Sequence, residues 1–279
     1  METCSLAEVL GRTGDVLPAL GEYHIVALDE QHPVAVSTLG SFELPDILAA
    51  KKPNGMCVVG KTETENIGIE KIIRNILAAP NIRYLLLCGE DSQGHLSGQT
   101  MLSLFENGVN ERMRVVGSKG KRPILANTTP QAVAAFTNQT EIIDMIGCTD
   151  ADKIIRKIEE LAAQIPGQRR MPVQTPADAV PDIKVITAKP KDPQKVKLDR
   201  AGYFVIVPKA ELGIILVEHY NYANQLLRVI QGDNARDIYW TIIENNWISE
   251  MSHAAYLGKE LAAAQLSMQL GFKYIQDKA

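Results

Sequence analysis

Short apolar runs alternate with segments of helical periodicity between residues 34 and 163, and this alternation constrains the fold more than any other feature of the chain. The apolar runs predict strands at 34–40, 56–60, 82–88, 114–117 and 141–147. Helical spacing of apolar residues follows at 67–77, up to about 107, at 130–138 and at 152–163. Because parallel strands need long crossover connections, which are usually helices, this order predicts an α/β fold. We expect a Rossmann-like, mostly parallel sheet with helices on both faces.

The alternation stops at a segment of linker composition. Residues 165–181 contain four prolines and two adjacent arginines, and they show no apolar periodicity. We therefore expect a first domain at 1–164, a linker at 165–181 and a second domain at 182–279.

The second domain has strand-like runs first and helical segments last. Strands are expected at 183–186, 203–207 and 213–218, and helices near 234–246 and 252–270. The second and third of these strands are close enough in sequence to form a hairpin. This order predicts a small α+β domain.

Charge and composition exclude several classes of protein. The net charge of -4 and the pI near 5.8 are the opposite of what a nucleic-acid binder needs. No apolar stretch approaches the roughly 20 residues of a membrane span, and the N-terminus lacks the pattern of a secretory signal. The four cysteines form no CxxC pair, so neither a zinc knuckle nor a disulfide framework is indicated. We expect a cytoplasmic protein without a membrane anchor that binds no nucleic acid.

The loop at 89–99 lies where a ligand site is expected. It joins the apolar run at 82–88 to a helical segment, and open α/β sheets bind ligands at the carboxyl ends of their strands. Three glycines in the loop let the backbone approach something large and flat. At the centre of the loop lies a potential metal ligand, His95.

His95 has three interpretations: a loop histidine bonded to nearby backbone, a general base, or a ligand of a single metal. The residues suggest no triad, since Glu90 and Asp91 do not form one with it and no nucleophile is marked. A lone histidine cannot hold a naked ion, because zinc takes about four protein ligands. It can, however, be the axial ligand of a metal that a macrocycle already holds. Its other ring nitrogen would then be fixed by a carboxylate, a carbonyl or water.

The neighbouring loops favour one kind of macrocycle. Haem would want an apolar, aromatic-rich pocket, whereas the loops at 62–66 and 118–120 are polar. A corrinoid, which is edged with amide groups, suits such loops better, although each loop by itself is also an ordinary solvated connection. Dinucleotide binding is disfavoured, because no GxGxxG follows a strand and no GxxxxGK[ST] occurs.

Several motifs in register carry a resemblance to a known family. They lie at 36–41, 64–71, 88–99, 106–108, 116–120 and 143–148. Together they resemble the corrinoid subunit of tetrahydromethanopterin S-methyltransferase, the A component of that complex, over about residues 21–163. The resemblance implies a Rossmann-like domain that binds cobalamin or a related cobamide with its own lower base displaced. His95 matches the histidine of the family's G-H-x-x-G-Q stretch and would be the lower axial ligand of the cobalt.

The other expected cofactor-binding residues lie in the same loops. They are Thr64, Glu65, Asn66, Gly68, Gly89, Gln93, Gly94, Gly98, Gln99, Ser118, Lys119 and Gly120. The chain lacks the D-x-H-x-x-G signature of commoner cobalamin-binding modules, so their aspartate has no counterpart in its sequence. No residue is given a catalytic role, because the cofactor would supply the reactive group.

Two departures from the family shape the expected function. The methanogen protein carries a C-terminal membrane anchor and belongs to a sodium-pumping complex, whereas here a linker and a second domain take the place of the anchor. The resemblance thus implies a soluble carrier of a methyl group on cobalt. It would work between a methyl-pterin (methyl-tetrahydrofolate or methyl-tetrahydromethanopterin) and an acceptor in one-carbon metabolism. It would need a separate pterin-dependent methyltransferase subunit, and a homo-oligomer is left open. The alternative is a non-catalytic corrinoid-binding, storage or regulatory module.

The second domain resembles an uncharacterised domain attached to pterin-related proteins. Its residues His253, Tyr256 and Glu260 are spaced to share one face of a helix. They could form a small polar site or take part in packing, and packing is the favoured interpretation.

Overall fold

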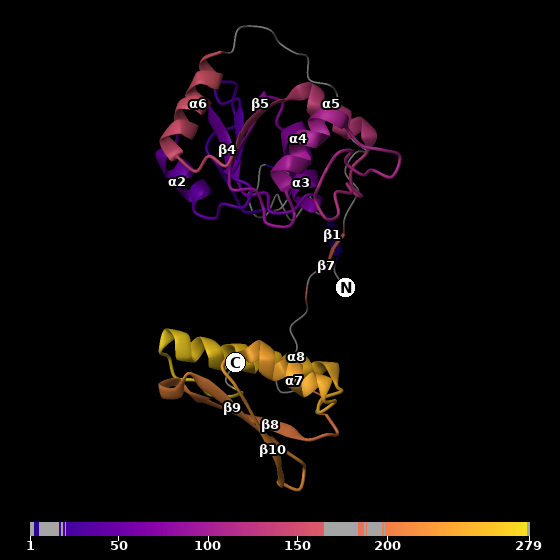
Figure 1. The fold of residues 1–279 in the computed structure, drawn as a ribbon, viewed down its shortest axis with the longest axis vertical. Helices are drawn as coiled ribbons and strands as arrows, with labels where there is room; N and C mark the ends of the chain where they lie inside the picture. Colours follow the sequence, from indigo (N-terminus) through magenta and orange to yellow (C-terminus); the bar gives the residue numbers. More distant parts are fainter. Residues whose placement is uncertain are drawn as a thin grey trace. The chain divides into compact units, whose positions relative to one another are not determined.

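The computed structural model describes residues 3–5, 17, 19, 21–164, 184–186, 188, 197 and 199–277. These residues divide into two compact units, Met1–Thr187 and Ala188–Ala279 (Figure 1). The linker expected at 165–181 lies outside the described residues, so the domain limits placed on either side of it remain a prediction.

The first unit is built on a five-stranded sheet in the order β2-β4-β3-β5-β6. Its parallel strands are β3 (Val34–Ser37), β4 (Met56–Gly60), β5 (Tyr84–Gly89) and β6 (Glu141–Ile146). One edge is the short antiparallel strand β2 (Tyr23–Ile25). The expected α/β class and mostly parallel sheet are confirmed.

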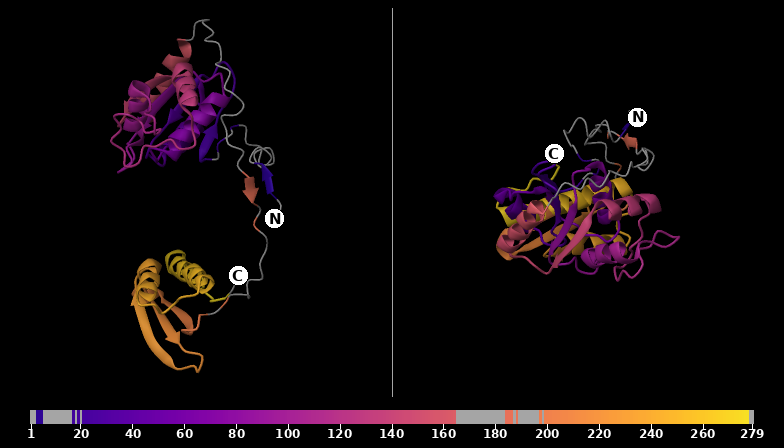
Figure 2. Two further views of the ribbon diagram at one scale, coloured as in Figure 1. Left: turned by 90° about the vertical axis from the view of Figure 1, so that its right-hand side faces the viewer. Right: turned by 90° about the horizontal axis from the view of Figure 1, so that it is seen from above.

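Helices cover both faces of this sheet (Figures 1 and 2). On one face lie α3 (Ile67–Ala78), α4 (Ser97–Asn107) and α5 (Pro130–Gln139). On the other lie α2 (Leu44–Lys51) and α6 (Ala151–Ala163). Successive side chains of a strand point to opposite faces, so each face of β3 contributes to a different core. Ala35 packs in the core beneath α3, α4 and α5, whereas Val34 and Val36 pack in the core beneath α2 and α6. The connections that follow β4 and β5 meet at the carboxyl ends of the parallel strands, and the candidate site lies there.

The strand expected at 114–117 is not part of the sheet, and that prediction was wrong. The segment forms only isolated bridges, Val109 with Val115 and Arg114 with Ile124. We call residues 109–124 the arm, because this stretch returns on itself between α4 and α5 instead of adding a strand. The expected strand rested on two adjacent valines, Val115 and Val116, but only Val115 is buried and Val116 is exposed.

The second unit is a three-stranded antiparallel sheet with two helices on one face (Figure 2). Its strands are β8 (Tyr203–Lys209), β9 (Ile214–Tyr220) and β10 (Leu226–Gly232), in the order β10-β9-β8. A short 3-10 turn, η2 (Ala210–Leu212), joins the first two strands, which pair as the expected hairpin. The helices are α7 (Ala235–Glu244) and α8 (Met251–Leu270). The small α+β domain is therefore confirmed, with β10 as a third strand beyond the expected hairpin.

The strand expected at 183–186 is present as β7 (Lys184–Ile186). It pairs with β1 (Thr3–Ser5) and not with the strands of the second unit. Among the described residues, no helix is both long and apolar enough to cross a membrane.

Candidate functional site

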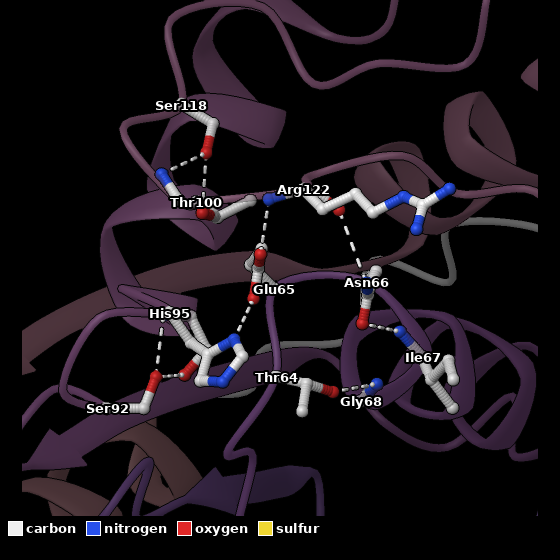
Figure 3. Close-up of polar contacts among 12 residues, drawn as sticks. Thr64, Glu65, Asn66, Ile67, Gly68, Ser92, His95, Thr100, Ser118 and Arg122 are labelled. Carbon is white, nitrogen blue, oxygen red and sulfur yellow. Dashed lines mark hydrogen bonds and ion pairs between the residues drawn. The ribbon is translucent and has the colours of Figure 1, made fainter.

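His95 lies in the loop between β5 and α4, and a carboxylate holds its ring (Figure 3). Its Nδ1 is 2.6 Å from Oε2 of Glu65, a residue of the loop that follows β4. The His95 side chain is 44% exposed, whereas the Glu65 side chain is 1% exposed. No described residue forms a hydrogen bond with Nε2 of His95. This second nitrogen is therefore the one available to a ligand.

Both carboxylate oxygens of Glu65 are engaged. Oε1 accepts a hydrogen bond from the backbone N–H of Arg122 at 2.5 Å, and Oε2 faces His95. Burial alone would raise the pKa of the Glu65 carboxyl, but the hydrogen bonds from the backbone N–H of Arg122 and from His95 outweigh it and lower this pKa. Glu65 is thus an ionised acceptor, which assigns a proton to Nδ1 of His95. In the neutral ring, the lone pair then lies on Nε2.

The backbone beneath His95 is fixed by side chains of its own loop. Asp91 accepts hydrogen bonds from the N–H groups of Gly98, at 2.8 Å, and Gln99, at 3.0 Å. These amides at the start of α4 would otherwise lack a partner. Ser92 Oγ donates to Ser97 Oγ at 2.9 Å, and Ser97 Oγ donates to the carbonyl of Thr62. The loop is therefore tied both to α4 and, through Ser97, to the loop that follows β4.

The arm is fastened over this loop by residues of α4. The Gln99 amide accepts from the N–H of Lys119 at 2.8 Å and donates to the carbonyl of Gly117 at 3.2 Å. Thr100 Oγ1 lies 2.7 Å from Ser118 Oγ. A Cβ atom at Gly120 would lie 2.6 Å from the carbonyl oxygen of His95 and 2.7 Å from Cγ of Glu65. Only glycine fits there, so the arm packs directly against the Glu65 side chain and the backbone of His95.

The remaining loop residues organise the start of α3. Asn66 is the N-cap, since its Oδ1 accepts from the N–H of Ile67 at 2.7 Å. Its amide also donates to the carbonyl of Arg122 at 3.3 Å. Thr64 Oγ1 accepts from the N–H of Gly68 at 2.9 Å. These residues hold Glu65 between the helix start and the arm (Figure 3).

The predicted site residues separate into three groups. The bonded assembly around His95 contains Thr64, Glu65, Asn66, Gly68, Gln99, Ser118 and Gly120. The exposed surface of the loop and arm contains Gln93, Gly94 and Lys119. Gly89 and Gly98 face the interior, where an added Cβ would lie 2.5 Å from the carbonyl oxygen of Thr38 and 2.6 Å from Cδ1 of Leu39 respectively. At both of these glycines the backbone packs closely against its neighbours, so a side chain would not fit there.

Sequence reasoning missed Arg122, Ser92 and Ser97. Arg122 acts through its backbone N–H, and no side-chain pattern signals such a contact. Both serines are buried and hydrogen-bonded to each other. They therefore offer no nucleophile that a histidine base could activate.

The donor set fits a metal that a macrocycle already holds. Within the described part of the chain, no group of three or more His, Cys, Asp or Glu residues could bind a metal ion. A single outward imidazole nitrogen, backed by a buried carboxylate, is instead the arrangement of an axial ligand. The carboxylate partner expected from that chemistry is Glu65.

Comparison with known proteins places this region in a family. The model of the MtrA family, which comprises the A component of tetrahydromethanopterin S-methyltransferase, matches residues 15–173. The chain belongs to the MtrA family. Every predicted site residue lies within the match.

Curated MtrA proteins support the match. The chain is 41% identical over 142 residues to the MtrA 2 protein of Methanothermobacter thermautotrophicus, which covers 50% of this chain and 74% of the relative. The MtrA 2 protein of Methanobrevibacter ruminantium is 40% identical over 156 residues, 56% of this chain and 78% of the relative. The MtrA protein of Methanocaldococcus jannaschii is 40% identical over 148 residues, 53% of this chain and 59% of the relative.

A second model, PterinBD-DUF4346, matches residues 198–277, which lie in the second unit. Here His253 Nδ1 accepts from the N–H of Asp199 at 3.1 Å. Tyr256 donates to Asp277 at 2.5 Å, and Glu260 accepts from Tyr274 at 2.9 Å. Each of the three residues that share a face of α8 has a partner within the unit, which agrees with a packing role.

Proposed function

We propose that this protein is a corrinoid-binding component of a methyltransferase system, with His95 as the lower axial ligand of the cobalt. When bound, cobalamin or a related cobamide would supply the metal on which a methyl group is carried between a methyl-pterin and an acceptor. A separate pterin-dependent methyltransferase subunit would serve as the partner. Membership of the MtrA family supports the methyl-transfer role.

The observation that carries the proposal is the contact between His95 and Glu65. An imidazole that ligates a metal through one nitrogen commonly donates its other N–H to a carboxylate, which fixes the tautomer and the ring orientation. Here Glu65 performs that role from a buried position, and Nε2 is left without a described partner. The family resemblance singled out the histidine, and its contact with Glu65 supports the proposed role as a ligand.

The chain's own residues have separate tasks in this function. Glu65 keeps a proton on Nδ1 of His95 and so directs the lone pair of Nε2 outward. The backbone N–H of Arg122 and the close approach of Gly120 keep the Glu65 carboxylate in place. Gln99 and Thr100 attach the arm that carries both of these groups. The cofactor supplies the reactive atom, while the protein supplies orientation and access.

The direct test is a spectrum of the protein loaded with cobalamin and reduced to its paramagnetic form. Electron paramagnetic resonance then reports the nitrogen bound below the cobalt. We expect the splitting pattern to change when the protein is produced with nitrogen-15 histidine, because the ligand comes from the protein and not from the cofactor's own base. His95→Ala should remove that response to the label.

His24→Ala is a matched control. The His24 ring is also about half exposed and also lies against a carboxylate, with its Nε2 2.7 Å from Asp46. It lies in the same unit, but Asp46 is exposed, whereas Glu65 is buried. Retention of the labelled pattern in His24→Ala and its loss in His95→Ala would support the assignment. If the splitting pattern of the unsubstituted protein did not respond to the nitrogen-15 label, the assignment would be refuted. A separate methylation assay tests the role: cobalamin that binds but is never methylated by methyl-pterin and a methyltransferase would favour storage.

A further inference from the structure

The two larger sheets present four edge strands, and three of these are protected. In the first unit, β2 is only three residues long. The opposite edge, β6, carries Glu141 and Asp144, and Asp144 accepts from the N–H of Ile146 at 2.9 Å. Short strands, charged side chains and occupied backbone groups all prevent an edge from pairing with another chain.

The β8 edge of the second unit is closed by a side chain. The Gln276 amide accepts from the N–H of Ile206 at 2.9 Å and donates to the carbonyl of Phe204 at 2.8 Å. It thus takes up one donor and one acceptor on the free side of the strand. Pro208 and Lys209 at the end of β8 add two further features that disfavour strand pairing.

The β10 edge lacks such protection. The strand is seven residues long and contains neither proline, lysine nor an acidic residue. Its backbone pairs with β9 on one side, and no described residue hydrogen-bonds to its backbone on the other. Three of its apolar side chains are exposed, Leu226, Leu227 and Val229, and the last of these is 51% exposed.

The single charge of β10 is turned away from the exposed side chains. The Arg228 guanidinium lies 4.2 Å from the ring centroid of Trp247, and its NH1 is 2.8 Å from Nδ1 of His219. Both partners are in the core of the second unit or packed against it. Two β10 strands can therefore approach each other without bringing like charges together.

We propose that β10 is a dimerisation edge, which pairs with β10 of a second copy of this chain in an antiparallel, two-fold arrangement. The paired strands would extend one sheet through both copies. A second copy is the occupant that the edges favour. Because Gln276 closes β8, β10 cannot add to the β8 edge of another molecule, so the contact closes as a pair and does not grow into a fibre. The surface is distinct from the candidate corrinoid site.

The sheet itself offers a matched pair of substitutions. Val205 on β8 and Val229 on β10 both stand opposite Glu218 on β9, one on each side. Val229→Lys would place like charges across the two-fold contact, whereas Val205→Lys introduces the same lysine beside the same glutamate at the closed edge. The two variants therefore introduce the same charge beside the same glutamate, at opposite edges of the sheet.

The full chain should be measured by light scattering and sedimentation over roughly 1–100 μM protein. We expect a dimer for the unsubstituted chain and for Val205→Lys, and a monomer for Val229→Lys. A monomeric unsubstituted chain would overturn the proposal, and so would a dimer that Val229→Lys leaves intact or that Val205→Lys also disrupts. Amide exchange of the unsubstituted chain gives a second readout in case Val229→Lys fails to fold. Protection of residues 226–232 should rise with concentration while that of 203–209 stays constant, and equal behaviour of the two strands would contradict the proposal.

Discussion

The two units of this protein use histidine in opposite ways. In the first unit, His95 has one nitrogen held by a buried carboxylate and the other without a described partner, and its side chain is 44% exposed. In the second unit, His219 is 1% exposed and both of its nitrogens are engaged, with the carbonyl of Ala201 at 2.9 Å and with Arg228 at 2.8 Å. His253 is equally buried and accepts a backbone hydrogen bond from Asp199.

The difference separates the proposed ligand from two structural histidines. An imidazole that binds something must be fixed through one nitrogen and open at the other, and among these three histidines only His95 combines these features with a buried anchor. His219 stacks on Phe204 with ring centroids 4.4 Å apart, so its ring also fills space in the core. Substitutions should therefore affect ligand binding in one unit and stability in the other.

The largest expected effect is on the stability of the second unit. His219→Ala removes a stacked ring and leaves Arg228 and the carbonyl of Ala201 without their partner. We expect a loss of about 3 kcal/mol from the free energy of unfolding. Both tryptophans of the chain, Trp240 and Trp247, lie in this unit, so their fluorescence during urea unfolding reports it selectively.

His95→Ala is the comparison for that measurement. The His95 side chain is half exposed and does not belong to a hydrophobic core. The free energy of unfolding that tryptophan fluorescence reports should therefore change by no more than about 0.5 kcal/mol. If His95→Ala shifted this transition as much as His219→Ala, the distinction between the two kinds of histidine would fail.

A smaller effect is expected from the carboxylate that prepares His95. In Glu65→Gln, the side chain keeps one acceptor and gains a donor. One of its two partners, His95 Nδ1–H or the N–H of Arg122, then faces an N–H group. We expect the affinity of the protein for cobalamin to fall about 10–100-fold, the usual cost of removing such a partner.

Glu63→Gln provides the control for this prediction. Glu63 lies two residues earlier in the same loop and is exposed, and within the described residues its charge contact is with Lys61 at 3.8 Å. The same loss of charge there should leave cobalamin affinity unchanged. Equal losses in both variants would mean that the net charge of the loop matters and that the Glu65–His95 contact does not.

Sequence patterns predicted the frame of the first unit because its core strands obey simple rules. The apolar run at 56–60 coincides with β4, and helical spacing placed α3 within one residue of its observed end. The segment at 114–117 misled the same reasoning. Val115 is buried and its N–H bonds to the carbonyl of Pro123 within the arm, whereas Val116 is exposed. An apolar pair in the sequence therefore shows neither that both side chains are buried nor that the segment pairs with a strand of the sheet.

The candidate site was predictable in part. His95 and Glu65 were both expected in the site, yet their contact joins residues 30 positions apart and depends on how the loops after β4 and β5 meet. In the second unit, β10 escaped notice because its pairing with β9 shifts register between Leu226 and Arg228. That irregularity breaks the alternation by which a half-buried strand is recognised.

The smallest effect in this series is a pH dependence confined to the second unit. Burial lowers the pKa of both His219 and His253, so each is neutral in the folded protein near neutral pH. The unfolded chain, with histidine pKa values near 6.5, binds more protons as the pH falls, so stability must decrease in that direction. Asp199 lies beside this group, but backbone hydrogen bonds outweigh its burial and hold its pKa far below the usual range, so it does not titrate here.

The stabilisation should be complete above pH 6.5 and should decline from there toward the lower pKa values of the folded state. Between pH 7.5 and 6.0 we expect the tryptophan-monitored free energy of unfolding to fall by about 1 kcal/mol. His253→Asn keeps an acceptor for the N–H of Asp199 but cannot be protonated, so it should reduce the slope to the contribution of His219. If the free energy of unfolding of His253→Asn depended on pH as steeply as that of the unsubstituted chain, His253 would not contribute to the pH dependence. A slope of opposite sign would mean that the buried histidines are charged in the fold, and the contrast with His95 would then need a different physical basis.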